Sequence, residues 1–144
     1  IKRLTEENLP VTLALSLHAP TDEIRKTIMP AAKMATIEEL LELTDNYAEK
    51  TGRRVTFEYA LIRGVNDSIK CAEELGSLLS GRLCHVNLIE ANPVQGRDFK
   101  RGANKREFVN ILSRHNVTAT VRRELGKDIS ASCGQLKKSV AKGE

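Results

Sequence analysis

The stretch TIEELLELTDNYAEKTGRRVTFEYALI, residues 36–62, decides the fold because it encodes a capped helix followed at once by a strand. Thr36 and Glu39 have the spacing of a capping box, and apolar residues recur after them at helical intervals. Gly52 is expected to end this helix in the left-handed conformation. Residues 55–62 then form the predicted strand, so the stretch is one helix–strand unit.

The same alternation extends in both directions along the chain. Strands are predicted at residues 11–17, 55–62, 85–89 and 117–122. Helices are predicted at 21–29, closed by Pro30, at 36–52, from Ser68 to Gly81, and after a cap formed by Asn104 and Glu107. Connections of this length imply parallel strands joined by right-handed crossovers. The predicted fold class is therefore α/β, with four strands and three intervening helices forming half of a barrel-like sheet.

Composition indicates an ordinary globular protein. Hydrophobic residues make up 40% and charged residues 29%, and no apolar run approaches the roughly 20 residues that span a bilayer. The chain opens without Met or a signal peptide, so we expect it to begin within a longer cytoplasmic protein that does not enter the membrane. Three cysteines at irregular spacing do not form a secreted disulfide framework.

Charge is distributed unevenly between the two parts of the chain. Residues 1–95 contain 11 basic and 14 acidic residues, whereas residues 96–144 contain 12 and 5, so the net charges are −3 and +7. Such asymmetry indicates an anionic partner for the C-terminal third, although solvated surface charge is the alternative. The densest basic cluster comprises Arg97, Lys100, Arg101, Lys105 and Arg106. Aromatic residues are only 3%, which argues against a base-stacking platform in this segment.

Several polar segments follow the predicted strands. Residues 16–18 end the first strand, residues 63–67 follow the second, residues 90–93 end the third, and Cys133 lies beyond the fourth. Ligands of parallel α/β folds bind at the carboxyl ends of strands, so we expect these segments to converge on one rim.

Cys133 lies in the loop segment ASCGQL, residues 131–136. Small neighbours allow a substrate to approach the sulfur, and Arg122, Arg123 and Lys127 would favour the thiolate. Taken alone, a packed and unreactive thiol is the commoner explanation for such a cysteine. Cys71 and Cys84 are expected to be structural thiols, because their separation suits no metal site.

Four stretches in this order resemble the radical S-adenosylmethionine (SAM) RNA adenine methyltransferases. They are SLHAP at 16–20, GVNDS at 64–68, VNLIEANP at 86–93 and ASCGQL at 131–136. The resemblance covers about Val11 to Leu136 and implies a partial, TIM-like (β/α) barrel. Residues 1–144 would be the C-terminal portion of its core domain. The family's Cys-x-x-x-Cys-x-x-Cys motif, which holds a [4Fe-4S] cluster, does not occur here, so the fragment alone is expected to be inactive.

The resemblance also implies roles for individual residues. Ser16, Leu17, His18 and Asn92 would line the SAM pocket, and Cys133 would carry a methyl group from SAM as S-methylcysteine before its transfer to the base. Asn66 and Asp67 are better explained by an Asx-turn before the next helix than by ligand binding. The side of the strand on which Glu58 lies is undetermined, so Glu58 is assigned no role.

Members of the family methylate C2 of an adenine in 23S ribosomal RNA and also act on tRNA, with a reducing electron donor. With this resemblance, phosphate contact becomes the better explanation of the basic cluster. Two alternatives stay open: a relative that methylates C8 of the same adenine, and a non-catalytic basic RNA-binding module in which Cys133 is inert. The first strand is expected to leave an open sheet edge through which the fragment associates with itself.

Overall fold

The computed structural model describes residues 1–90 and 104–122, and its centre is a four-stranded sheet. The elements in chain order are α1 (Lys2–Glu7), β1 (Ala14–Ser16), α2 (Asp22–Ile28), the 3-10 helix η1 (Pro30–Lys33), α3 (Ile37–Thr51), β2 (Val55–Leu61), α4 (Ile69–Leu79), β3 (Cys84–Glu90), α5 (Lys105–Arg114) and β4 (Ala119–Val121). The strands follow the order β1-β2-β3-β4, and every neighbouring pair is parallel. The predicted α/β class with parallel strands and crossover helices is confirmed.

The register of the sheet aligns one residue from each strand in a transverse row. Ser16 pairs with Glu58, Glu58 with Asn87, and Asn87 with Thr120. Since successive side chains of a strand point to opposite faces, these four residues share one face of the sheet. One end of this row is Ser16, the last residue of β1.

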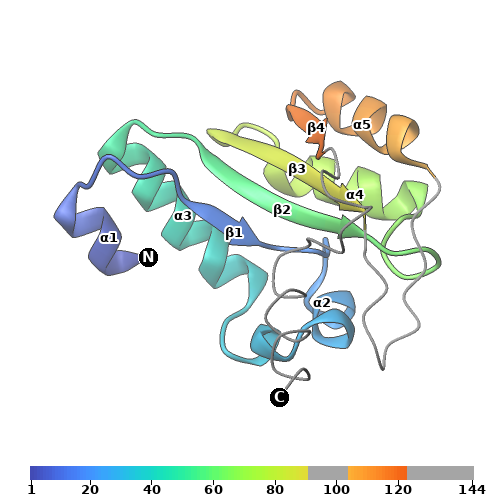
Figure 1. Cartoon of the computed structure of the whole chain (residues 1–144), viewed down its shortest axis with the longest axis horizontal. Coiled ribbons are helices and arrows are strands. Elements are labelled where there is room, and N and C mark those ends of the chain that lie inside the picture. The colour runs from blue at the N-terminus through green and yellow to red at the C-terminus, as the bar shows by residue number, and fades with distance from the viewer. Residues whose placement is uncertain (91–103, 123–144) are drawn as a thin grey trace, which may run out of the picture.

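The core lies on the opposite face, where the helices pack. Buried and half-buried residues alternate strictly along β2. The buried ones, Val55, Phe57, Tyr59 and Leu61, are each no more than 1% exposed. They form one apolar cluster with side chains of α3, α4 and α5. Figure 1 shows α3 and α4 lying along the sheet. The residues between them on β2 are only half-buried, so no described helix covers that second face.

Local sequence signals explain where the helices begin and end. Thr36 and Glu39 form the complete predicted capping box: the Glu39 amide donates to Thr36 Oγ1 at 3.2 Å, and Glu39 Oε2 accepts from the Thr36 amide at 2.8 Å. Gly52 ends α3 with φ 64°, and Ser68 Oγ accepts from the Cys71 amide to begin α4. The prediction that the Asn104 side chain caps the last helix is wrong. Asn104 precedes α5 but makes no side-chain capping hydrogen bond.

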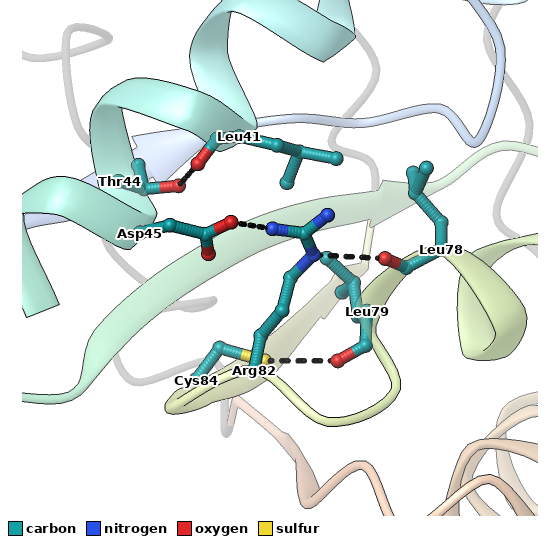
Figure 2. A network of polar contacts seen from close by, with 7 residues as sticks. All are labelled: Leu41, Thr44, Asp45, Leu78, Leu79, Arg82 and Cys84. Carbon is teal, nitrogen blue, oxygen red and sulfur yellow. Dashed lines mark hydrogen bonds and ion pairs between the residues drawn. The ribbon is translucent and has the colours of Figure 1, made fainter. Parts of the chain in front are cut away.

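Polar contacts tie α3 to the turn between α4 and β3, as Figure 2 shows. The Arg82 guanidinium pairs with the Asp45 carboxylate and donates from Nε to the Leu78 carbonyl at 3.0 Å. Cys84 lies next to this turn with its sulfur 3.9 Å from the Leu79 carbonyl oxygen. Burial raises the pKa of the Cys84 thiol, which keeps it protonated. This network therefore stabilises the helix layer.

The described elements differ from the predicted ranges mainly at the first strand. Residues 14–16 form β1, whereas residues 11–17 were predicted, and the short helix α1 was not predicted at all. Cys71 and Cys84 are both buried free thiols in the core cluster, in agreement with a structural role. In the part of the chain that the structure describes, no helix has the length and apolarity needed to cross a bilayer.

Candidate functional site

The candidate site begins where β1 ends. Ser16 is exposed, Leu17 is fully buried in the core and His18 is half-buried, so the three predicted SAM-contacting residues face different surroundings. Ser16 and His18 are placed at the carboxyl end of the strand, as predicted. Leu17 points into the core, which leaves its backbone as the part that lies at the rim.

His18 interrupts the regular pairing of β1 with β2. The amides of Leu17 and His18, just after β1, both donate to the Glu58 carbonyl, at 3.0 and 3.2 Å, so two successive residues oppose a single acceptor on β2. Such an arrangement is a bulge, and the His18 backbone adopts φ 60°, in the left-handed region that non-glycine residues rarely occupy. The bulge turns the imidazole back onto β2, where Nδ1 accepts from the Ala60 amide at 3.0 Å.

The electrostatic surroundings keep His18 neutral. Burial lowers the pKa of the imidazole below its usual value of 6.5, and the positive charge of Arg25 lowers it further. The carboxylate of Glu58 acts in the opposite direction but more weakly. At neutral pH the ring is therefore an uncharged hydrogen-bonding group.

Asn66, which follows β2, is completely buried and joins the two loops of the rim. Its Nδ2 donates to the carbonyls of His18 and Ala60, at 2.7 Å each, and its Oδ1 accepts from the Ile62 amide at 2.7 Å. The Tyr59 hydroxyl donates to the Asn66 carbonyl at 2.8 Å. Asn66 thus has a structural role, while Asp67 accepts from the Gly64 amide at 2.9 Å within the predicted turn.

Arg25 reaches the same segment from α2. Arg25 is only 4% exposed. Its guanidinium donates to three carbonyls: from Nε to Leu17 at 3.1 Å, from Nη2 to Ser16 at 3.3 Å and from Nη1 to Ala35 at 3.2 Å. A guanidinium is suited to this task because its donors have a fixed planar arrangement. Arg25 therefore fixes the backbone of Ser16 and Leu17.

The uncovered face of the sheet continues the site across β2 and β3. Asn87 Nδ2 donates to both carboxylate oxygens of Glu58, at 3.2 and 3.1 Å. His85 lies one row earlier, with its ring nitrogens 3.1 and 2.9 Å from the hydroxyl oxygens of Thr118 and Thr120. The structure therefore resolves the side of Glu58, which lies on this polar face and close to the rim.

The described residues suit SAM better than an iron-sulfur cluster. Ser16 and His18 at the end of β1, and Glu58 and Asn87 on the uncovered face, are polar groups of the kind that hydrogen-bond a nucleoside. SAM held there would supply the methyl and 5′-deoxyadenosyl groups. Among residues 1–90 and 104–122, no group of three or more cysteine, histidine or acidic side chains is arranged to hold a metal ion. Cys71 and Cys84 lie in the core cluster and are not placed to hold a metal cluster.

Several predicted site residues lie outside the described residues: Asn92, Arg97, Lys100, Arg101 and Cys133. Of the predicted RNA-binding cluster, Lys105 and Arg106 are described. Lys105 at the start of α5 pairs with the Glu90 carboxylate at the end of β3, whereas Arg106 is exposed. The two basic residues thus differ in their surroundings.

Arg25 and Asn66 were not predicted to belong to the site. Asn66 was recognised only as a turn residue, and its burial depends on contacts with residues distant in the chain. Arg25 had no sequence signal beyond its place in a helix rich in charged residues. A basic residue at this position is expected on the solvent side, and only the fold brings it to the carbonyls of β1.

Comparisons with known proteins identify named relatives of this chain. A probable dual-specificity RNA methyltransferase RlmN of Lachnoclostridium phytofermentans is 53% identical over 96% of this chain and 40% of its own length. Its counterpart of the same name in Clostridium perfringens is 51% identical over 100% of this chain and 42% of its own length. The chain therefore spans about two fifths of these curated relatives. No family model matches it.

Solved structures give the same result. A radical SAM methyltransferase from Sphaerobacter thermophilus is 50% identical, with a TM-score of 0.86 over 92% of this chain and 40% of that one. A domain of a pyruvate-formate lyase-activating enzyme from Bacteroides vulgatus is only 18% identical, and its TM-score of 0.66 shows a shared fold alone. This chain is strongly similar to the RlmN proteins and to the Sphaerobacter enzyme along nearly all of its residues, which confirms the resemblance seen in the motifs. The chain belongs to the radical SAM methyltransferase family that includes the RlmN proteins.

Proposed function

We propose that this chain is the SAM-binding and methyl-carrying part of an RNA methyltransferase that acts on C2 of adenine in 23S ribosomal RNA and in tRNA. The observation that carries the proposal is the identity of about one half to relatives named as dual-specificity RNA methyltransferases. The position of Ser16 and His18 at the carboxyl end of β1, where ligands of such folds bind, supports it.

The residues divide the work between binding and reaction. Ser16, His18 and Asn92 would contact SAM, with Leu17 contributing its backbone, and Cys133 would accept a methyl group as a thiolate and carry it to the base. SAM and a [4Fe-4S] cluster held elsewhere in the enzyme would supply the radical chemistry that an electron-poor aromatic carbon requires. Arg97, Lys100, Arg101, Lys105 and Arg106 would contact RNA phosphates.

The test uses a full-length enzyme that carries this chain, in which Cys133→Ala is compared with Cys71→Ala. Cys133→Ala should abolish methylated adenosine while SAM binding persists, because the change removes a reactant. Cys71→Ala removes a thiol of the core cluster and should leave product formation in place. Mass spectrometry of the wild-type enzyme should find one added methylene, about 14 Da, on the peptide that contains Cys133.

The product distinguishes the proposal from its alternatives. Chromatography of digested RNA should yield 2-methyladenosine, whereas 8-methyladenosine would assign the chain to the C8 group. Undiminished product in Cys133→Ala would contradict the carrier role. If the full-length enzyme binds RNA but methylates none of it under assay conditions, the non-catalytic module would be favoured.

A further inference from the structure

The ladder between β1 and β2 stops at an unusual place. Thr56 donates to the Leu13 carbonyl at 2.9 Å, and Leu17 donates to Glu58 at 3.0 Å, as in a regular parallel ladder. The next bond in that pattern would run from the Ala60 amide to the Leu17 carbonyl. Instead, Ala60 donates to Nδ1 of His18, and the Leu17 carbonyl accepts from Nε of Arg25.

An imidazole nitrogen has thus replaced a backbone carbonyl in the sheet. Because a backbone amide can only donate, Nδ1 of His18 must carry a lone pair and the ring proton of the neutral form must reside on Nε2. The hydrogen bond therefore selects one of the two tautomers. The ring's Nε2–H is the polar group that remains to contact a ligand.

Two buried side chains hold this arrangement in place. Asn66 donates to the His18 carbonyl and to the Ala60 carbonyl at 2.7 Å each, so one amide group fixes both partners of the imidazole bond. Arg25 donates to the Leu17 carbonyl, which the interrupted ladder leaves without β2 as a partner, and also to the Ser16 carbonyl. The left-handed backbone of His18 is unfavourable by itself, so these contacts must offset its cost.

We propose that Asn66 and Arg25 are positioning residues that fix His18 as a neutral Nε2–H hydrogen-bond donor to the nucleoside ligand. This inference rests on the proposed function for the identity of the ligand, a SAM-type nucleoside. A neutral donor suits the acceptor nitrogens and oxygens of such a ligand and introduces no positive charge beside a sulfonium. The lowered pKa of His18 agrees with this state, although Glu58 opposes the effect of Arg25.

The first measurement needs neither a ligand nor a variant. Long-range ¹H–¹⁵N correlation spectra of the whole chain at pH 7.5 should show His18 Nδ1 as an unprotonated nitrogen and Nε2 as a protonated one. His85 and His115 provide internal references in the same spectrum. A protonated Nδ1, or two nitrogens averaged between tautomers, would overturn the inference.

The second measurement tests the positioning residues. Asn66→Asp keeps the shape of the side chain but removes both Nδ2 donors, and it should abolish the single-tautomer signal of His18. Asn110→Asp, at an exposed position of α5, is the matched control and should leave the signal unchanged. If Asn66→Asp does not fold, Arg25→Lys decides, because the one nitrogen of lysine lacks the planar fork by which Nε, Nη1 and Nη2 of Arg25 each reach a different carbonyl. An unchanged His18 signal in a folded variant would contradict the positioning role.

A titration with S-adenosylhomocysteine separates this inference from the proposed function. Perturbation of His18 Nε2–H by the ligand, lost in Asn66→Asp, would support both. A fixed tautomer that does not respond to the ligand would count against the proposed function and against His18 as its ligand donor, while leaving the internal arrangement intact. Ligand binding with an averaged tautomer would overturn the inference alone.

Discussion

At the residue scale, His18 shows how strongly neighbours decide the behaviour of one side chain. Its position in the sequence indicates a polar residue at a strand end, yet its conformation depends on contacts from α2 and from the loop after β2. Hydrogen bonds from neighbouring segments hold its backbone torsion and select its tautomer, while burial and the charge of Arg25 lower its pKa.

The lowered pKa of His18 predicts a pH dependence of stability. The unfolded chain takes up a proton near the usual value of 6.5, whereas the folded chain does so only at lower pH. The contribution of neutral His18 to the free energy of unfolding should therefore be fully present above this value. It should be lost progressively as the pH drops toward 5. His18→Asn, which keeps an acceptor and tolerates a positive φ, should reduce this fall in urea unfolding experiments. His85→Asn is the comparison, because burial and Arg54 also lower the pKa of His85. An identical pH slope in wild type and His18→Asn would contradict the prediction.

Gly76 provides a second prediction at this scale. A Cβ added there would lie 2.4 Å from Cδ2 of His115, whose Nε2 is 2.6 Å from Glu73 Oε2. Gly76→Ala should therefore destabilise the chain by about 1–3 kcal/mol by overpacking α4 against the end of α5. In a His115→Ala background the same change should be neutral or stabilising, since alanine favours a helix over glycine by about 1 kcal/mol. Equal costs in the two backgrounds would show that His115 is not the obstacle.

At the element scale, the helices are held by signals of unequal quality. The capping box at Thr36 is complete, whereas Asn104 precedes α5 without a side-chain bond to it. Helix α5 is instead attached through Phe108, Ile111 and Leu112, all buried in the core. Packing thus compensates for the missing cap.

This difference predicts unequal costs for the same kind of substitution. Thr36→Ala should lower the free energy of unfolding by about 1 kcal/mol, because it removes one member of a reciprocal pair of hydrogen bonds. Asn104→Ala should cost much less, since no such bond is lost. Chemical denaturation of the two variants provides the measurement. A larger loss for Asn104→Ala would mean that α5 depends on the residue that precedes it.

The sequence was sufficient for the helices with self-contained signals. Thr36, Gly52 and Ser68 each act on backbone groups within a few residues, so their roles are visible in the printed letters. The end of β1 was predicted less well, because the bulge at His18 depends on Arg25 and Asn66. A partner eight or forty-eight residues away leaves no local pattern. The predicted roles of Asn92 and Cys133 stay predictions, since both lie outside the described residues.

At the scale of the whole molecule, the sheet separates two functions by face. Helices cover the apolar face, and the polar face with Glu58 and Asn87 is left to the site. Within the basic C-terminal third of the chain, the structure describes α5, whose first residues are Lys105 and Arg106. RNA phosphate and a SAM-type ligand would therefore meet the molecule near the same rim.

Lys105 and Arg106 should contribute unequally to RNA binding. Arg106→Gln should reduce the slope of log affinity against log salt by about one, as expected for one lost phosphate contact. Lys105→Gln should reduce it less, because the Glu90 carboxylate already neutralises the ammonium. Filter binding of a 23S RNA fragment at several salt concentrations would measure both slopes. Equal slopes for wild type and Arg106→Gln would show that Arg106 is solvated surface charge.

The Glu90–Lys105 ion pair joins the last residue of β3 to the first residue of α5. It thereby ties together the two ends of residues 91–104, the segment that contains Asn92 and three of the predicted phosphate-binding residues. The ion pair thereby holds the start of α5 against the carboxyl end of β3 before any ligand arrives. A phosphate that competes with Glu90 for Lys105 would loosen the tether.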